Sequence, residues 1–101
     1  MAKKDKNIWP FSDPENVAFI TLKGNISREQ PILLVTHDAE DGGWQFLDGS
    51  LEPKEENTAI VSLLGITKID PTVRALADLP LGWRAWRRSV RESWERGLKQ
   101  E

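Results

Sequence analysis

The sequence predicts a small α+β domain, in which an antiparallel sheet of about four strands packs against one short helix. Two observations lead to this prediction. Runs of β-branched and aromatic residues alternate with turn signals in the first half of the chain, while a sharp helix start and a stripe of tryptophans occupy the second half. Strands and helices follow one another without a regular βαβ rhythm, which favours an antiparallel sheet.

Length and composition are those of one globular domain. The chain has 101 residues, of which 39% are hydrophobic and 30% are charged. It contains no cysteine, so disulfides, thiolate zinc sites and thiol nucleophiles are excluded. Neither the apolar run of a signal peptide nor a stretch of membrane-spanning length occurs. We therefore expect a cytoplasmic protein with no membrane partner.

The first elements follow from local composition. Residues 1–16 are polar and contain two prolines, so we expect a flexible segment ahead of a single α+β domain over residues 17–101. Residues 17–22 are rich in β-branched side chains and apolar on both faces, which predicts a central strand. Residues 32–35 form a short, continuous apolar run, which is typical of a strand that is buried on both faces.

Residues 36–49 predict the turn and the second strand of a β-hairpin. Asp41, Gly42 and Gly43 are the residue types that a tight turn requires where φ is positive. Trp44 and Phe46 follow at alternate positions and therefore share one face of a strand. We expect the two glycines to reverse the chain and the two aromatic rings to fill the core.

Residues 59–69 are also rich in β-branched side chains, which predicts a strand with a bend at Gly65. The sharpest helix start in the chain comes next. Asp70 can cap free backbone amides, and Pro71 is tolerated at the first helical position, so we expect a short helix over residues 71–78.

The carboxy-terminal segment has helical periodicity. Trp83, Trp86 and Trp94, together with Val90 and Leu98, fall within one arc of a helical wheel. This pattern favours a helix over residues 84–99 that packs its tryptophan stripe against the sheet. The three tryptophans are therefore expected to be structural.

Two segments resemble a known group of proteins. Residues 37–46 read HD-x-EDGGWQF and residues 77–86 read ADLP-x-GW-x-AW. In these segments the chain resembles a family of small, uncharacterised bacterial proteins with a domain of unknown function, distantly similar to the immunity proteins of polymorphic toxin systems. The resemblance implies no activity that can be carried over. It does imply an extended ending, because relatives have a proline before the last tryptophan. Residues 89–93 lack that proline, so the helix prediction is kept.

The acidic side chains near the hairpin and the single histidine, His37, are the candidates for catalysis or metal binding. A general base at His37 would need a nucleophile and an oxyanion site, and neither is identifiable. The carboxylates fail the Ca²⁺-loop template, because glycines stand at two of its ligand positions. A small-ligand or metal binder, or an enzyme, built around His37 is retained as an alternative. We expect no cofactor and no metal.

Charge is unevenly distributed along the chain. Residues 1–80 carry 8 basic and 13 acidic side chains, whereas residues 81–101 carry 6 and 3. Arginines interleaved with tryptophans at this end are compatible with nucleic-acid binding. The acidic pI of about 5.4 and the expected burial of the tryptophans argue against it. Neither of the glycine-rich phosphate-binding motifs, GxxxxGK followed by Ser or Thr and GxGxxG, occurs in the sequence.

Two charged surfaces of opposite sign favour protein recognition instead. The sequence thus predicts a non-enzymatic protein-binding module with an unidentified protein partner, immunity-like and toxin-neutralising by resemblance. The expected partner-binding residues are Asp38, Glu40, Asp41, Asp48, Arg84, Arg87, Arg88 and Arg91. The expected structural residues are Gly42, Gly43, Trp44, Phe46, Asp70, Pro71, Trp83, Trp86 and Trp94.

Overall fold

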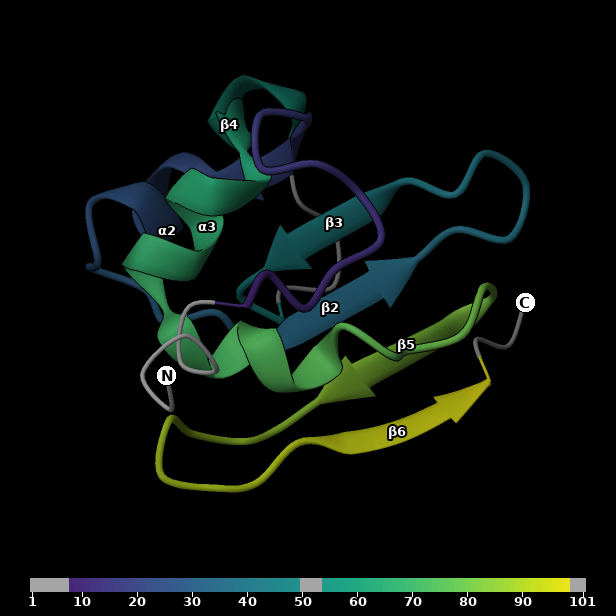
Figure 1. Cartoon of the computed structure of the whole chain (residues 1–101). Coiled ribbons are helices and arrows are strands. Elements are labelled where there is room, and N and C mark those ends of the chain that lie inside the picture. The colour runs from purple at the N-terminus through teal and green to yellow at the C-terminus, as the bar shows by residue number, and fades with distance from the viewer. Residues whose placement is uncertain (1–7, 50–53, 99–101) are drawn as a thin grey trace.

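The computed structural model describes residues 8–49 and 54–98, which form an α+β domain around one six-stranded sheet (Figure 1). The strand order is β4-β1-β3-β2-β5-β6. The strands are β1 (Ala18–Leu22), β2 (Leu34–His37), β3 (Trp44–Leu47), β4 (Thr58–Ser62), β5 (Trp83–Trp86) and β6 (Glu95–Leu98). The helices are α2 (Lys23–Ile26), α3 (Leu63–Ile69) and the 3₁₀ helices η1 (Glu55–Asn57) and η2 (Pro71–Leu76). The predicted fold class is confirmed.

The sheet is mixed, so the expectation of about four antiparallel strands is wrong in number and in direction. β1 runs parallel to β3, with Thr21 opposite Phe46, and every other pair is antiparallel. The Thr21 hydroxyl donates to the Phe46 carbonyl over 2.7 Å. β1 and β3 are parallel neighbours because β3 lies between β2, its partner in the hairpin, and the earlier strand β1. No local sequence signal specifies such an insertion.

The predicted hairpin is confirmed. β2 and β3 pair from Leu34 opposite Leu47 to His37 opposite Trp44, so the first strand begins two residues later than expected. Trp44 and Phe46 are buried, as expected. Of the two turn glycines, only Gly42 has a positive φ, of 73°.

Residues 59–69 are not one strand. β4 ends at Ser62, whose hydroxyl accepts a hydrogen bond from the Gly65 amide and so caps α3. A Cβ at position 65 would lie 2.8 Å from Cγ1 of Val61. Gly65 therefore lets the first turn of α3 pack against the strand, whereas we expected it to bend a strand. An N-cap hydrogen bond outweighed the β propensity of this segment.

The helix that starts after Asp70 is a 3₁₀ helix, and it ends at Leu76, two residues before the expected boundary. The predicted cap is confirmed, because the Asp70 carboxylate accepts from the Thr72 amide over 3.0 Å. Val73 and Leu76 are fully buried. The helix therefore contributes two side chains to the core.

The predicted helix over residues 84–99 is absent from the described part of that range. The segment instead forms the antiparallel strands β5 and β6, with β5 also paired to β2. Pairing with β2 on one edge and β6 on the other satisfies the backbone of β5 without a helix. Since Trp83 and Trp86 are three residues apart in a strand, they lie on opposite faces of the sheet. The tryptophans therefore form no single stripe.

All helices that contribute to the core lie on one face of the sheet. The core is made by Phe11, Ile32, Val35, Trp44, Phe46, Leu63, Ile66, Val73, Leu76, Leu79 and Ala85. The other face, hereafter the open face, carries the exposed side chains of Ile20, Gln45 and Ile60. No helix of the described residues is long and apolar enough to cross a membrane.

Part of the segment expected to be flexible is held against the core. The Trp9 indole N–H donates to the Asp13 carbonyl over 2.6 Å, and the Trp44 indole N–H donates to the Asp13 carboxylate over 3.0 Å. Phe11 is 5% exposed. Residues 1–7, the rest of the expected flexible segment, lie outside the described residues.

Candidate functional site

The two charged clusters lie at opposite ends of the sheet. The β2–β3 turn carries Asp38, Glu40 and Asp41, and the connection between β5 and β6 carries Arg88 and Arg91. Since β2 and β5 are antiparallel neighbours, the end of β2 and the end of β5 point in opposite directions. Figure 1 shows the β2–β3 turn at one end of the strands and the β5–β6 connection at the other.

Carboxylates at the acidic end hold the turn together. Asp38 accepts from the amide of Glu40 over 2.7 Å, and Asp41 accepts from the amide of Gly43 over 2.8 Å. Both side chains are exposed. Asp48, which follows the opposite end of β3, is not brought together with the other three. The predicted acidic cluster is therefore a group of three residues.

His37 has a structural environment. Its Nδ1 lies 2.7 Å from the Leu79 carbonyl oxygen, so this nitrogen carries the proton and donates it. The imidazole stacks on Trp44 with 3.8 Å between the ring centroids. No three His, Cys, Asp or Glu residues in the part of the chain that the structure describes are placed to hold a metal ion.

The four predicted arginines are spread over three environments. Arg84 lies on the open face, where its guanidinium carbon is 5.6 Å from the Trp86 ring centroid. Arg88 and Arg91 are exposed in the β5–β6 connection, whereas Arg87 is buried, with 4% of its surface exposed. This burial argues against the expectation that Arg87 contacts a partner, although the residue also lines the groove described below. It belongs to the core, and the arginines and tryptophans form no continuous surface.

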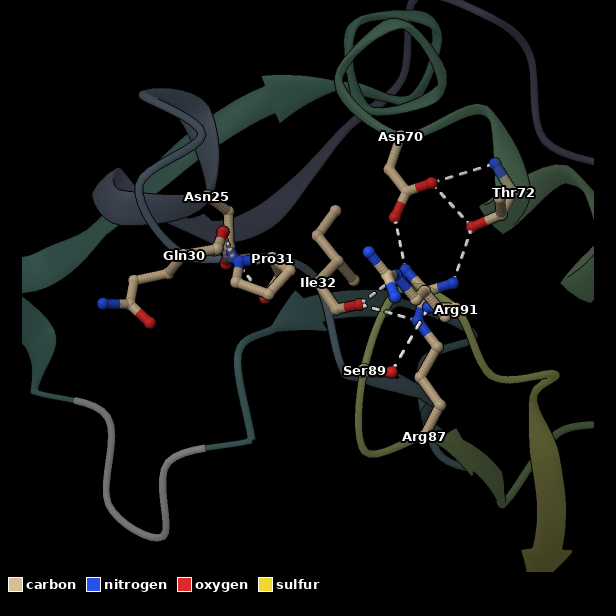
Figure 2. Close-up of polar contacts among 9 residues, drawn as sticks. All are labelled: Asn25, Gln30, Pro31, Ile32, Asp70, Thr72, Arg87, Ser89 and Arg91. Carbon is tan, nitrogen blue, oxygen red and sulfur yellow. Dashed lines mark hydrogen bonds and ion pairs between the residues drawn. The ribbon is translucent and has the colours of Figure 1, made fainter.

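Arg87 joins three segments of the fold (Figure 2). Its guanidinium forms a 2.6 Å ion pair with Asp70 and donates twice to the Ile32 carbonyl, over 3.0 and 3.2 Å. It also donates to the Thr72 hydroxyl over 3.1 Å. The Trp94 ring covers it, 4.1 Å from the guanidinium carbon. The charge of Arg87 is thus used inside the protein, and it fixes the start of η2 against the end of β5.

An open groove of about 550 Å³ lies between η2 and the β5–β6 connection. Pro71, Ala75 and Leu76 form its apolar wall on the η2 side, and Trp94 lies opposite. The Nε1–H of Trp94 is buried and has no acceptor among the described residues. Val90, at the rim, is 57% exposed. The groove therefore combines a mainly apolar wall with the ring of Trp94, whose N–H is buried within the protein.

The charges around this groove differ in whether they are compensated. Arg96 forms a 2.8 Å ion pair with Asp78, which lies outside the groove. The hydrogen bond from Arg96, and then its positive charge, lower the pKa of Asp78. Glu92 is paired with Arg88 over 3.4 Å.

Arg91 differs from these side chains. No carboxylate of residues 8–49 or 54–98 lies within ion-pair distance of its guanidinium. Its backbone amide is held by the Ser89 hydroxyl over 3.3 Å. Arg91 therefore gives the groove an uncompensated positive charge, close to a wall that is mainly apolar.

A second cavity, of about 520 Å³, opens on the open face. Arg84, Trp86, Leu34 and Asp48 contribute to its lining. Nε of Arg84 is buried there without a hydrogen-bond partner in the described part of the chain. The structure thus places Asp48 near Arg84 and away from the acidic turn.

Sequence reasoning missed the groove. The sequence identifies Trp94 as a structural residue and Arg91 as a partner-binding residue. A helix over residues 84–99, however, would have placed Trp94 in a stripe against the sheet. The groove exists because the β5–β6 connection passes beside η2, and this neighbourhood depends on strand pairing. No local pattern in the sequence could have revealed the unpartnered N–H of Trp94.

Fold and site together define a small α+β protein with one mixed sheet, oppositely charged ends and a basic groove beside η2. No protein-family model, curated protein sequence or solved structure matches this chain.

Proposed function

We propose that this chain is a protein-binding module without enzymatic activity, and that it binds an acidic segment of its partner in the groove beside η2. The observation that carries the proposal is an unpaired cation beside an apolar wall, because Arg91 lines the groove together with Ala75 and Leu76. Within the described residues, the Arg91 guanidinium has no carboxylate partner.

A partner carboxylate in the groove would form a charge-assisted hydrogen bond with Arg91. Apolar side chains next to that carboxylate have a matching wall in Ala75 and Leu76 and a rim contact in Val90. The preferred segment therefore contains Asp or Glu beside an aliphatic residue.

The resemblance to immunity-like proteins supports a more specific role, the neutralisation of a toxin in the cytoplasm. The opposite charges at the two ends of the sheet favour one orientation of an encountering partner. In this role the groove holds the acidic segment, and the turn with Asp38, Glu40 and Asp41 faces a basic part of the partner.

The test uses the product of the neighbouring gene, divided into overlapping peptides and also offered as the whole protein. We expect the full chain to bind peptides in which Asp or Glu lies beside Leu, Ile or Val. The matched variants are Arg91→Gln and Arg88→Gln, because both arginines are exposed in the same connection but only Arg91 lines the groove. Titration calorimetry measures the affinity of each.

Arg91→Gln should weaken binding about tenfold, the effect of losing one charge-assisted hydrogen bond. Arg88→Gln should change the affinity less than about twofold, in line with the small value of exposed charges. Binding that is indifferent to Arg91 but lost in Arg88→Gln would contradict the groove. A preference for basic peptides would contradict the proposed partner chemistry.

A further inference from the structure

The two edges of the sheet differ in how they are protected. β6 carries Glu95, Arg96 and Gly97, residue types that disfavour pairing at an edge. β4 reads TAIVS and has no charge, proline or glycine. Its central residue, Ile60, is 74% exposed. The β4 edge therefore has none of the side-chain devices that usually prevent a sheet from adding another strand.

The register of β4 shows which backbone groups point away from the sheet. β4 pairs with β1 without a bulge, from Thr58 opposite Leu22 to Ser62 opposite Ala18. The Leu63 amide continues this ladder by donating to the Val17 carbonyl over 2.8 Å. Because hydrogen-bonded and non-hydrogen-bonded pairs alternate in an antiparallel ladder, positions 59 and 61 bond to β1. The amides and carbonyls of Thr58, Ile60 and Ser62 therefore point outward.

Two of these six outward groups are already used. The Thr58 amide donates to the Glu55 carbonyl, and the Ser62 carbonyl, at the N-cap of α3, accepts the first helical hydrogen bond. Four groups are left without a backbone partner among the described residues: the Thr58 carbonyl, the Ile60 amide, the Ile60 carbonyl and the Ser62 amide.

We propose that a second copy of this chain pairs with this edge, antiparallel and with a two-fold axis at Ile60. In this arrangement Ile60 faces Ile60 of the other copy as a hydrogen-bonded pair, and the Ser62 amide of each copy donates to the Thr58 carbonyl of the other. The four free groups of each copy are then all used.

Other antiparallel registers of the same strand fit less well. A shift by two residues in one direction would aim the Ile60 amide at the Ser62 carbonyl, which already accepts within α3. A shift in the other direction would aim the Ile60 carbonyl at the Thr58 amide, which Glu55 already holds. The free groups are therefore complementary to themselves only in the register centred on Ile60, and this self-complementarity favours a second copy as the occupant.

The side chains agree with this pairing. Ile60 lies opposite Ile20 on the open face, where Ile20 is 38% exposed. Across the two-fold axis, Ile60 of each copy lies against its equivalent, so that four isoleucines form one apolar strip. A single five-residue strand buries less surface than the roughly 1,200–2,000 Å² of standard interfaces. The dimer should therefore be weak and dependent on concentration.

Sedimentation equilibrium of the full chain, from about 10 μM to about 1 mM, tests the association, since weak complexes have dissociation constants in this range. We expect a reversible monomer–dimer equilibrium. Ile60→Lys should weaken it at least about tenfold, because two lysines would face each other across the axis. The control is Leu98→Lys on the opposite edge, at a side chain that is 63% exposed, and it should leave the equilibrium unchanged.

Site-specific crosslinking tests the register. The chain contains no cysteine, so Ile60→Cys and Leu98→Cys each introduce a single thiol. Residues of a hydrogen-bonded antiparallel pair have Cα atoms about 5.5 Å apart, a distance that a disulfide spans. Under mild oxidation, Ile60→Cys should form a covalent dimer much faster than Leu98→Cys.

A wild-type chain that stays monomeric throughout the concentration range overturns the proposal. So does a dimer that persists in Ile60→Lys, or equal crosslinking rates for the two thiol variants. These readouts need no other protein, so they are independent of whether the groove beside η2 binds a partner.

Discussion

Arg87, at the end of β5, and Asp70, directly before η2, form an ion pair of 2.6 Å in which the arginine side chain is 1% exposed and the aspartate side chain 15%. The second carboxylate oxygen of Asp70 accepts from the amide and the hydroxyl of Thr72, over 3.0 and 2.6 Å. One carboxylate therefore caps the 3₁₀ helix and also holds the strand that follows it. This pair positions both walls of the groove.

Arg87→Ala should lower the free energy of unfolding by about 3–5 kcal/mol, because removal of one partner of a buried ion pair leaves the other uncompensated. Urea denaturation followed by tryptophan fluorescence measures the change. Arg88→Ala is the control. Its ion pair with Glu92 involves an arginine side chain that is 88% exposed, so the loss should stay below about 1 kcal/mol. Equal effects of the two substitutions would refute the structural role of Arg87.

Gly65→Ala should be destabilising, although alanine in place of glycine usually stabilises a helix by about 0.5–1 kcal/mol. The added Cβ would lie 2.8 Å from Val61 Cγ1 and 3.2 Å from the Ser62 hydroxyl. We expect a net loss of about 1–3 kcal/mol from this overpacking. Val61→Ala removes the methyl group that the new Cβ would meet. Gly65→Ala should therefore lower the melting temperature less in a Val61→Ala background than in the wild type, as measured by thermal unfolding.

Gly42→Ala should cost about 1–2 kcal/mol, because φ is 73° at this position and an L side chain is strained there. Apart from the glycine and its two chain neighbours, no atom of the described residues lies within 4 Å of the added Cβ, so the cost comes from the backbone. Gly42→Asn should retain more stability than Gly42→Ala, since asparagine tolerates the left-handed region. If alanine and asparagine were equivalent in chemical denaturation, the strain explanation would fail.

The ion pair between Asp78 and Arg96 should make the stability of the protein depend on pH. Arg96 lowers the pKa of Asp78 below its ordinary value of 3.8. A lowered pKa in the folded state stabilises the protein above the unfolded-state pKa, and this contribution is lost as the pH falls through the folded-state pKa. The difference in unfolding free energy between the wild type and Asp78→Asn should therefore be constant near neutral pH and shrink in acid.

Urea midpoints from neutral pH to about pH 2, below the ordinary carboxyl pKa, check this profile. Since the Asp78 side chain is 79% exposed, the difference should be small and should decrease further at high salt. Arg96→Gln removes the other partner and should lose the same pH-dependent contribution. A difference between wild type and Asp78→Asn that grows towards low pH would contradict the sign.

The sequence was informative about the candidate site only where a site residue also belongs to a local motif. Asp38, Glu40 and Asp41 lie together because one turn carries them. Asp48 was grouped with them by sequence distance, but it follows the far end of β3. The charge distribution along the sequence predicts that Arg87 lies on the surface together with Arg88 and Arg91. Its burial depends on Asp70, which is 17 residues away, and composition cannot report such a pairing.

By itself the sequence determined the elements that neighbouring residues control. The hairpin follows from a turn whose glycine adopts a positive φ, and the start of η2 follows from an aspartate that caps the next amides. Both depend on hydrogen bonds and torsions within a few residues, so a local pattern specifies them.

Tertiary structure decided the remainder. The segment from Trp83 onward has helical periodicity, but β2 and β6 provide backbone partners along the two edges of β5. The parallel contact of β1 with β3 and the groove beside η2 have the same origin. Each depends on hydrogen bonds between residues distant in sequence, whose free energy outweighs local preference.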